Sequence, residues 1–495
     1  MMLFIFLSSG LFLGWSLGAN DAANIFGTAV STKMIRFRVA AYTAGFFVIL
    51  GAVVGGAGAT HTLGQLGSVD AIAGAFMVAF SAGFTVFLMT RYRLPVSTSQ
   101  AIVGSIIGWN LYAGMVTDSG LMSKIFMTWV LCPLLAALIA MMLYAVTRWI
   151  RNRVRITLLG EDRRTRMGLI IIGAFGAYSL GANNIANVVG VFASVQIFDP
   201  INVFGLFTLN GNQILFLIGG VAIAIGIITY SHKVMDTVGA NIIKLSPLTA
   251  FIAVLAESIV LFLFSSQSLE AWLLRHGLPA IPLVPVSSSQ AVVGAVIGVG
   301  LVRNFRQIRF KVIGDIAAGW VITPIVAGLI TFVFLFFLQN VFNQKVHQKV
   351  EYLISEEVVR VLEADGINEK TLLGYRGKVF DNEIAFYRSL MLDFNEDEET
   401  VLTILQKAKV SPVMISEDIL HKQLDRHYLS ADQLHALEAL TGQSFQYHWQ
   451  FDQALQLQSV AWRYQPAVIE NRIYNQALKR KYEYLYHTFA AAPQF

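Results

Sequence analysis

The chain has 495 residues, of which 55% are hydrophobic and 14% are charged, and its mean hydropathy is +0.60. Soluble domains carry about 25% charged residues, so this composition excludes a wholly soluble protein and requires lipid as part of the solvent. The single cysteine, Cys132, excludes a disulfide framework and a cysteine-based zinc site. Residues 1–340 hold 20 basic and 10 acidic side chains, and the remainder holds 16 and 21. The positive surplus therefore belongs to the apolar part and does not indicate nucleic-acid binding.

Ten apolar segments predict membrane-spanning helices. In chain order they lie near residues 2–31, 39–60, 69–90, 95–116, 122–147, 167–195, 202–230, 246–266, 285–302 and 312–340. Most reach the ~20 residues that cross ~30 Å of hydrocarbon as a helix. The first segment has no basic start and no small-residue cleavage site, so we interpret it as a spanning helix rather than a signal peptide.

The basic residues of this region concentrate in alternate connections, after the first, third, fifth, seventh and ninth segments. The positive-inside rule places these connections in the cytoplasm. Ten crossings then put the N-terminus and the end of the tenth helix outside, in a multi-pass protein of the inner cell membrane. Twelve crossings are the alternative count.

An internal repeat runs through the apolar region. The run Leu-Gly-Ala-Asn-Asp-Ala-Ala-Asn at 17–24 recurs as Leu-Gly-Ala-Asn-Asn-Ile-Ala-Asn at 180–187. The run Pro-Val-Ser-Thr-Ser-Gln at 95–100 recurs as Pro-Val-Ser-Ser-Ser-Gln at 285–290, and a Trp-x-x-x-Pro run at 129–133 recurs at 320–324. Five crossings per copy is an odd number, so the copies lie oppositely in the membrane, as in many secondary transporters. We predict an all-α fold of two inverted five-helix repeats, 1–150 and 165–342.

The composition changes near residue 344, and residues 345–495 read as a soluble, mainly helical domain. Periodic apolar patterns predict helices over 346–362, 398–409, 431–440 and 466–486. No motif in this domain indicates a chemistry, so its role stays open. The parity of ten crossings places it outside the cell membrane.

The first repeated motif puts amides and a carboxylate into apolar helices. An unpaired polar group in hydrocarbon costs several kcal/mol, so such a cluster is typical of a cavity or an ion site. Oxygen atoms of Asn and Asp are hard ligands suited to Na⁺ or a proton. A polar contact between helices is the alternative. We assign substrate binding to Asn20, Asn24, Asn183, Asn184 and Asn187, and the coupling cation, with Na⁺ as the candidate metal, to Asp21, Asn24 and Asn187.

The second repeated motif combines proline with a run of hydroxyl side chains before an apolar helix. Proline suits the first helical turn, and Ser or Thr caps the free N–H groups, which predicts a half-helix beginning at membrane depth. Such an N-terminus binds an anion without a cationic side chain; simple helix capping is the alternative. The predicted anion ligands are Ser97, Thr98, Ser99, Ser287, Ser288 and Ser289. Glu257, in the middle of a span, is a further candidate for the coupling cation, with an internal hydrogen-bonding role as the alternative.

The paired motifs resemble those of the inorganic phosphate transporter (PiT) family over about residues 10–335, and the two Trp-x-x-x-Pro runs support the resemblance. The resemblance implies symport of phosphate with Na⁺ or H⁺, as a metal–phosphate complex in some members. It points to the six Asn and Asp positions and the six hydroxyl positions named above. The stretch 255–258 resembles a Glu-Leu-Ala-Ser motif of some members, which supports Glu257.

The chain departs from the family pattern in three places. The second Asp of the pattern is Asn184, and the His that usually follows the hydroxyl run is replaced by Gln100 and Gln290. Loss of one negative ligand and two titratable groups weakens cation or proton coupling. The Asn-Asn motif and the Gln of the second half resemble a sulfate-transporting branch, whereas Asp21 resembles the phosphate type.

These observations predict a cation-coupled symporter, a secondary active transporter of inorganic phosphate. A sulfate permease of the same family is the alternative, and an anion channel or a membrane sensor is less favoured. No nucleophile–base pair or metal cluster indicates an enzyme. We predict no cofactor, Na⁺ or H⁺ as coupling ion, phosphate or sulfate and the lipid bilayer as partners, and no nucleic acid. A homo-oligomer is left open.

Overall fold

The computed structural model describes residues 2–67, 69–91, 96–153, 158–193, 198, 201–203, 207–238, 246–304, 308–367, 372–394, 397–422, 424, 426–466, 468 and 471–490. Contacts divide the chain into two compact units. Unit 1 comprises Met1–Tyr112, Thr117–Glu270 and Ile281–His347, and unit 2 comprises Ala113–Val116, Ala271–Ala280 and Gln348–Phe495.

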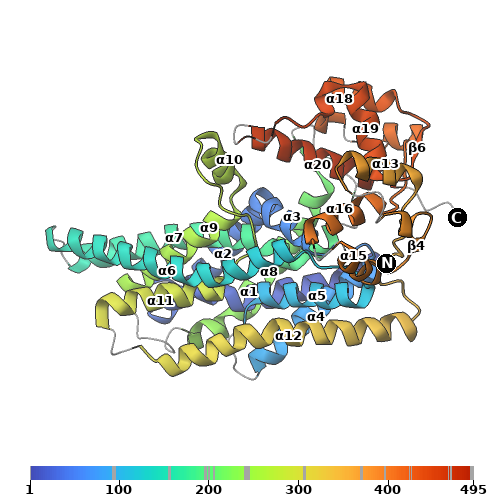
Figure 1. Cartoon of the computed structure of the whole chain (residues 1–495). Helices are drawn as coiled ribbons and strands as arrows, with labels where there is room; N and C mark the ends of the chain where they lie inside the picture. The colour runs from blue at the N-terminus through green and yellow to red at the C-terminus, as the bar shows by residue number, and fades with distance from the viewer. Residues whose placement is uncertain are drawn as a thin grey trace. The chain divides into compact units, whose positions relative to one another are not determined.

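Unit 1 is built from helices (Figure 1). In chain order they are α1 (Met2–Ser31), α2 (Phe37–Gly55), α3 (Ala57–Leu66), α4 (Ile72–Arg91), α5 (Thr98–Ala113), α6 (Ser119–Arg153), α7 (Leu158–Ala193), α8 (Gly211–Val238), α9 (Pro247–Ser265), α11 (Ser288–Asn304) and α12 (Phe310–Asn340). Helix α10 (Gln267–Arg275) begins in unit 1, and its residues from Ala271 on belong to unit 2. The strands β1 (Ile201–Val203) and β2 (Phe207–Leu209) form an antiparallel hairpin.

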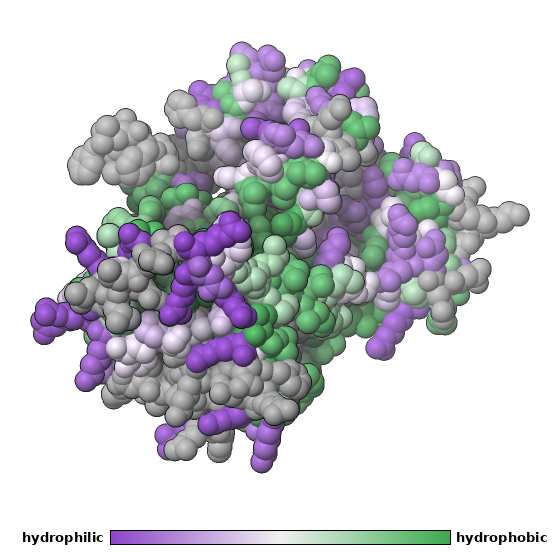
Figure 2. Space-filling view, turned by 90° about the vertical axis from the view of Figure 1, so that its left-hand side faces the viewer, coloured by the Kyte–Doolittle hydropathy of each residue, from purple (hydrophilic) through white to green (hydrophobic). Residues whose placement is uncertain are grey.

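Eight of the described helices are long and apolar enough to cross a membrane, and α11 is a shorter apolar helix. Helix α5 has 16 residues, which is about 24 Å. Large apolar side chains lie exposed along α6 and α12, including Leu134, Met142, Ile325 and Leu329, and Figure 2 shows broad apolar areas on the surface beside clusters of polar residues. Exposed apolar surface of this extent is typical of contact with lipid. The chain is a nearly all-helical, multi-pass membrane protein.

Two predicted segments differ from the helices observed. The segment near 39–60 is divided at Gly56 into α2 and α3, and a Cβ at this glycine would lie 2.3 Å from Ile185 Cγ2. The prediction of a helix near 202–230 was wrong at its start, since residues 201–203 and 207–209 form paired strands. Helix α8 begins only at Gly211, where Asn210 Oδ1 accepts a hydrogen bond from Gln213 N at 2.8 Å. This cap fixes the helix start.

Close backbone contacts in unit 1 recur in pairs that follow the sequence repeat. A Cβ at Gly18 would lie 2.0 Å from Ile223 O on α8, and one at Gly181 would lie 2.1 Å from Val48 O on α2. Both glycines belong to the repeated motif, so α1 packs on α8 as α7 packs on α2. Helices α1 and α7 run through the motifs unbroken. Because these glycines have no side chain, a neighbouring helix rather than a ligand approaches the backbone there.

The last helix of each half crosses the short helix of the other half. A Cβ at Gly104 of α5 would lie 2.1 Å from Pro324 O of α12, and one at Gly294 of α11 would lie 2.1 Å from Pro133 O of α6. The two Trp-x-x-x-Pro runs thus sit at equivalent crossings. Their prolines lie inside α6 and α12, where each removes one backbone hydrogen bond.

Unit 2 contains two consecutive modules, each with one pair of short strands and with helices between and after those strands. The first has β3 (Tyr352–Leu353), α13 (Glu356–Ala364), η2 (Leu373–Tyr375), β4 (Val379–Phe380), α15 (Glu383–Asp393) and α16 (Glu398–Ala408). The second has β5 (Val413–Met414), α17 (Glu417–Lys422), η3 (Arg426–Tyr428), α18 (Ala431–Glu438), β6 (Ser444–Phe445), α19 (His448–Gln458), η4 (Val460–Trp462) and α20 (Arg472–Thr488). Each module has its own hydrophobic core.

The equivalence of the modules extends to single hydrogen bonds. Strand β3 pairs antiparallel with β4, and β5 with β6. Gly377 N donates to Ile354 O at 2.9 Å, and Gly442 N donates to Ile415 O at 2.8 Å. Both glycines have positive φ, +73° and +83°. Matching sequence is sparse: Ile-Ser-Glu-Glu and Ile-Ser-Glu-Asp before the first helices, and a shared Gly-x₂-Phe-x₅-Phe-x₃-Leu spacing.

The predicted helix over 346–362 was wrong in its first half. Residues 352–353 form β3, and α13 begins at Glu356 after Ser355, whose hydroxyl accepts a hydrogen bond from Val358 N. The predicted helices over 398–409, 431–440 and 466–486 correspond to α16, α18 and α20. Helices α15, α17 and α19 were not predicted.

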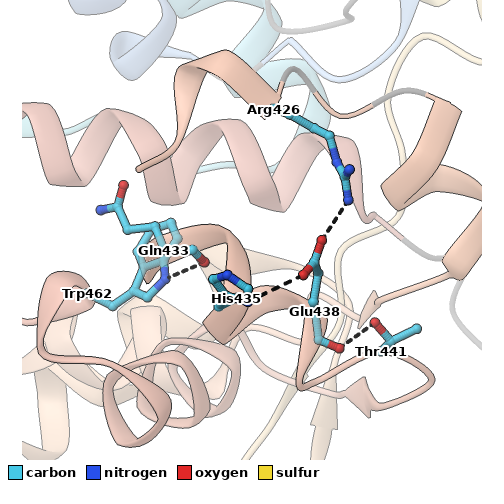
Figure 3. A network of polar contacts seen from close by, with 6 residues as sticks. All are labelled: Arg426, Gln433, His435, Glu438, Thr441 and Trp462. Carbon is cyan, nitrogen blue, oxygen red and sulfur yellow. Dashed lines mark hydrogen bonds and ion pairs between the residues drawn. The ribbon is translucent and has the colours of Figure 1, made fainter. Parts of the chain in front are cut away.

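Surface polar contacts hold the second module's α18 to its flanking segments (Figure 3). Glu438 forms an ion pair with Arg426 at 2.6 Å, and Trp462 Nε1 donates to Gln433 O at 3.2 Å. The ion-pair side chains are 45% exposed for Arg426 and 34% exposed for Glu438, so this pair contributes little, while the buried indole of Trp462 anchors η4 to α18.

Replacing Gly442 by Ala is expected to destabilise the second module by roughly 1–2 kcal/mol, because its φ of +83° disfavours any side chain although no atom lies within 4 Å of the added Cβ. Hydrogen exchange of β5 and β6 amides in the full-length protein measures the loss. Gly374→Ala, equally uncrowded but without positive φ, is the matched control. Equal protection in both variants would contradict the argument.

Stability of unit 2 is expected to depend on the protonation of Asp452. Burial raises the pKa of Asp452 to about 6, although the hydrogen bond from Tyr486 at 2.6 Å and the charge of Lys407 lower it. The unfolded value is about 3.9. The folded state therefore binds the proton more tightly, so this contribution to stability is fully present below pH 4 and is lost as the pH rises through 6, by about 3 kcal/mol.

Hydrogen exchange of α19 and α20 between pH 4 and pH 7 measures this dependence. Asp452→Asn is expected to flatten it, while Asp432→Asn at an exposed position of α18 leaves it as in the wild type. A pH dependence that survives in Asp452→Asn would assign it to other groups.

Candidate functional site

The two Asn-rich motifs lie on α1 and α7, and most of their side chains are buried. Asn183, Asn184 and Asn187 are at most 1% exposed, and Asp21 is 8% exposed. Asn20 and Asn24 are half-buried. A helix presents positions i, i+1 and i+4 on adjacent faces, so each motif directs its polar groups over about half of the helix surface.

The two hydroxyl motifs begin α5 and α11. Ser97 Oγ accepts a hydrogen bond from Gln100 N at 3.3 Å, and Ser287 Oγ accepts one from Gln290 N at 3.2 Å. These are N-caps, so each short helix begins inside unit 1 with a hydroxyl at its positive end. The predicted place of the proline was wrong for Pro285, which lies two residues before the cap and not in the first turn, because the capping serine takes the position next to the helix. Pro95 lies outside the described residues.

Asn183 fixes the extended segment that precedes α11. Its Nδ2 donates to Val286 O at 2.7 Å, and Val286 N donates to its Oδ1 at 2.9 Å. The amide thus pairs with a peptide unit as a neighbouring strand would. Asn20, the equivalent residue of the first motif, instead donates to Ser16 O on its own helix at 3.0 Å.

The starts of α5 and α11 are hydrogen-bonded to each other. Ser99 Oγ donates to Val286 O at 3.0 Å, and Ser289 Oγ donates to Val96 O at 3.0 Å. The two contacts are equivalent under the repeat. Both hydroxyl motifs therefore meet in one place, with their helix N-termini close together.

Asp21 connects the cluster on α1 to both motifs of the second half. Its Oδ2 accepts a hydrogen bond from Ser288 Oγ at 2.7 Å and one from Asn184 Nδ2 at 3.1 Å. Asn187 Nδ2 donates to Ser99 Oγ at 2.9 Å and so joins α7 to the start of α5. The four motifs, far apart in sequence, form one polar cluster.

Several buried acceptors of the hydroxyl and Asn-rich motifs, and of Glu257, lack a hydrogen-bond donor among the described residues. They are Asn187 Oδ1, Gln100 Oε1, Gln290 Oε1 and both carboxylate oxygens of Glu257. Buried acceptors without donors are costly. Free oxygens of this kind are suited to a cation, or to the hydroxyl of a protonated anion.

The structure brings together Asp21, Asn183, Asn184, Asn187 and the hydroxyls of both runs. Within the part of the chain that the structure describes, the hydrogen bonds given above do not join Asn20, Asn24 or Glu257 to this cluster. Sequence reasoning missed the backbone of Val96 and Val286 and the two glutamine oxygens. The repeat of the Gln after each hydroxyl run was the available signal.

Helices of this length and hydropathy, surrounding a buried polar cluster made by two opposed helix N-termini, define a membrane transport protein. Comparison with known families agrees. The model of the phosphate transporter family matches residues 17–331, more than half of the chain, and residues 281–417. The chain belongs to this family, which is a family of transporters and not of enzymes.

Individual relatives support the assignment. A protein of Pyrococcus furiosus, named as a candidate phosphate permease, is 28% identical over 410 residues, covering 66% of this chain and 94% of the relative. One of Haemophilus influenzae with the same description is 23% identical over 420 residues, covering 68% and 96%. Among solved structures, one named the sodium-dependent phosphate transporter is similar with a TM-score of 0.55 and 23% identity, covering 68% of this chain and 100% of that one. At this identity the similarity establishes the fold.

Proposed function

We propose that the chain transports inorganic phosphate across the cell membrane as a cation-coupled symporter. The hydrogen bond from Ser288 to Asp21 carries the proposal, because it joins the anion-type motif of one half directly to the carboxylate of the other. A ligand at the hydroxyl cluster and a cation at Asp21 then share a hydrogen-bonded contact. That proximity is the physical basis of coupling, since each charge stabilises the other in a site of low dielectric.

The anion would lie at the starts of α5 and α11. Ser97, Thr98 and Ser99, with Ser287, Ser288 and Ser289, supply hydroxyl donors, and the helix N-termini supply backbone N–H groups. None of the site residues is cationic, so the coupling cation completes the charge balance. The amide side chains of the two Asn-rich motifs orient these groups. They are Asn20 and Asn24 on α1, and Asn183, Asn184 and Asn187 on α7.

Sodium is the cation we favour. Asp21, Asn24, Asn187 and Glu257 are oxygen donors of the hard type that Na⁺ prefers, and the similar solved structure is named as sodium-dependent. A proton is the alternative. Segments 1–150 and 165–342 would act as two inverted repeats, and rocking of one against the other gives alternating access.

Uptake of labelled phosphate into proteoliposomes, with and without Na⁺ and pH gradients, tests the proposal. We expect uptake that an inward Na⁺ gradient drives. Uptake that only a pH gradient drives would mean that H⁺, and not Na⁺, is the coupling ion. Uptake of labelled sulfate instead of labelled phosphate would indicate a sulfate permease. Uptake of neither anion would remove the proposed function.

We propose that the tail, residues 345–495, lies on the external side of the cell membrane, where α12 ends. A reporter fused after Phe495 is expected to be active only on the external side, because ten crossings with basic connections inside place it there. A cytoplasmic signal would contradict the count of ten.

A further inference from the structure

The two repeated motifs differ in charge at one equivalent position. Asp21 of the first copy corresponds to Asn184 of the second. These two side chains meet, with Asn184 Nδ2 3.1 Å from Asp21 Oδ2. The two Asn-rich motifs therefore contribute one carboxylate, not two, where they converge.

Asn184 uses its polar atoms in hydrogen bonds to the protein. Its Oδ1 accepts from Asn183 Nδ2 at 2.8 Å and from Asn187 Nδ2 at 3.1 Å, and its Nδ2 donates to Asp21. An amide oxygen has two lone pairs, so both are occupied. With 1% exposure, Asn184 is buried among these partners and has no oxygen lone pair left for a cation.

Two oxygens of the residues that are hydrogen-bonded to Asn184 remain available. The hydrogen bonds to Asp21 go to Oδ2 and leave Oδ1 outside them. Asn187 Oδ1 is buried and has no donor among the described residues. One of these oxygens belongs to α1 and the other to α7, so together they suit a single cation with a ligand from each helix. The carboxylate of Asp21 supplies the negative charge that balances this cation.

We infer, building on the proposed function, that this chain binds one sodium ion with each anion and that the Asn184 amide replaces a second. A carboxylate at 184 would put two negative groups about 3 Å apart in a buried site, which requires a bridging cation or proton. In this chain the N–H group of the Asn184 amide takes the place of that bridging cation or proton, because it donates a hydrogen bond to Asp21. The anion is consequently accompanied by one compensating charge.

Equilibrium binding of ²²Na⁺ to the purified full-length protein with saturating phosphate tests the inference without transport. We expect one Na⁺ per chain in the wild type and two in Asn184→Asp. Asn340→Asp adds the same charge at an exposed position of α12 and is expected to leave the count at one. Two Na⁺ in the wild type would overturn the inference even if Asn184→Asp fails to fold, and an unchanged count in a folded Asn184→Asp would overturn the role of the amide.

The Na⁺ dependence of phosphate uptake provides the second readout. A Hill coefficient near 1 for the wild type and approaching 2 for Asn184→Asp is expected. Phosphate uptake driven by two Na⁺ in the wild type would remove this inference and leave the proposed function. No phosphate uptake by the wild type would remove the proposed function, while the binding count still decides how many cations the site holds.

Discussion

Asp21→Asn is expected to lower Na⁺-driven phosphate uptake by about 30-fold or more. The substitution removes the charge opposite a cation and weakens the bonds from Ser288 and Asn184, each made to a charged acceptor. Hydrogen bonds to charged groups contribute about 1.5–3 kcal/mol, and 1.4 kcal/mol corresponds to tenfold in affinity. The KM for Na⁺ should rise first, because the carboxylate acts on the cation directly.

Asp315→Asn is the matched control, since it removes an acidic residue at an exposed position of α12. Proteoliposome uptake with equal protein content measures both variants. Because Asn184 lies beside Asp21, the double variant Asp21→Asn with Asn184→Asp moves the carboxylate to the neighbouring side chain and is expected to recover part of the uptake. Wild-type uptake in Asp21→Asn would show that the carboxylate does not hold the coupling cation.

Gly104→Ala and Gly294→Ala are each expected to destabilise unit 1 by about 3 kcal/mol. The added Cβ would lie 2.1 Å from the carbonyl oxygen of Pro324 or of Pro133. Overpacking costs typically about 1–3 kcal/mol when side chains can move, and here the obstacle is backbone of a crossing helix, which cannot rotate away. Separation of α5 from α12 would also displace Ser97–Ser99 at the start of α5.

Thermal unfolding of the purified protein, followed by size-exclusion fluorescence, measures the loss as a lower Tm. Gly314→Ala is the control on α12, because no atom lies within 4 Å of its Cβ. A Tm equal to that of the control would mean that the two helices separate without cost, contrary to the packing described.

The membrane part could be predicted well because hydrophobic composition acts over long windows. A stretch of ~20 apolar residues has one stable arrangement in lipid, since every backbone group must be bonded within the helix. The segments near 2–31, 69–90 and 312–340 therefore correspond closely to α1, α4 and α12. The tail offered weaker signals. Its helices are short, and the duplicated module depends on two glycines with positive φ and a few buried aromatic residues that composition does not distinguish.

The sequence by itself determined the class of protein, the repeat and the residue types of the candidate site, because polar motifs that recur inside apolar helices are typical of a binding site built from two repeats. The tertiary structure alone decided how they meet. Asn183 pairs with the backbone of Val286, Asn184 with Asp21, and the glycines contact neighbouring helices. These contacts join residues up to 267 positions apart. Their partners are set by helix packing, which depends on the shapes of whole helices and leaves no local pattern in the sequence.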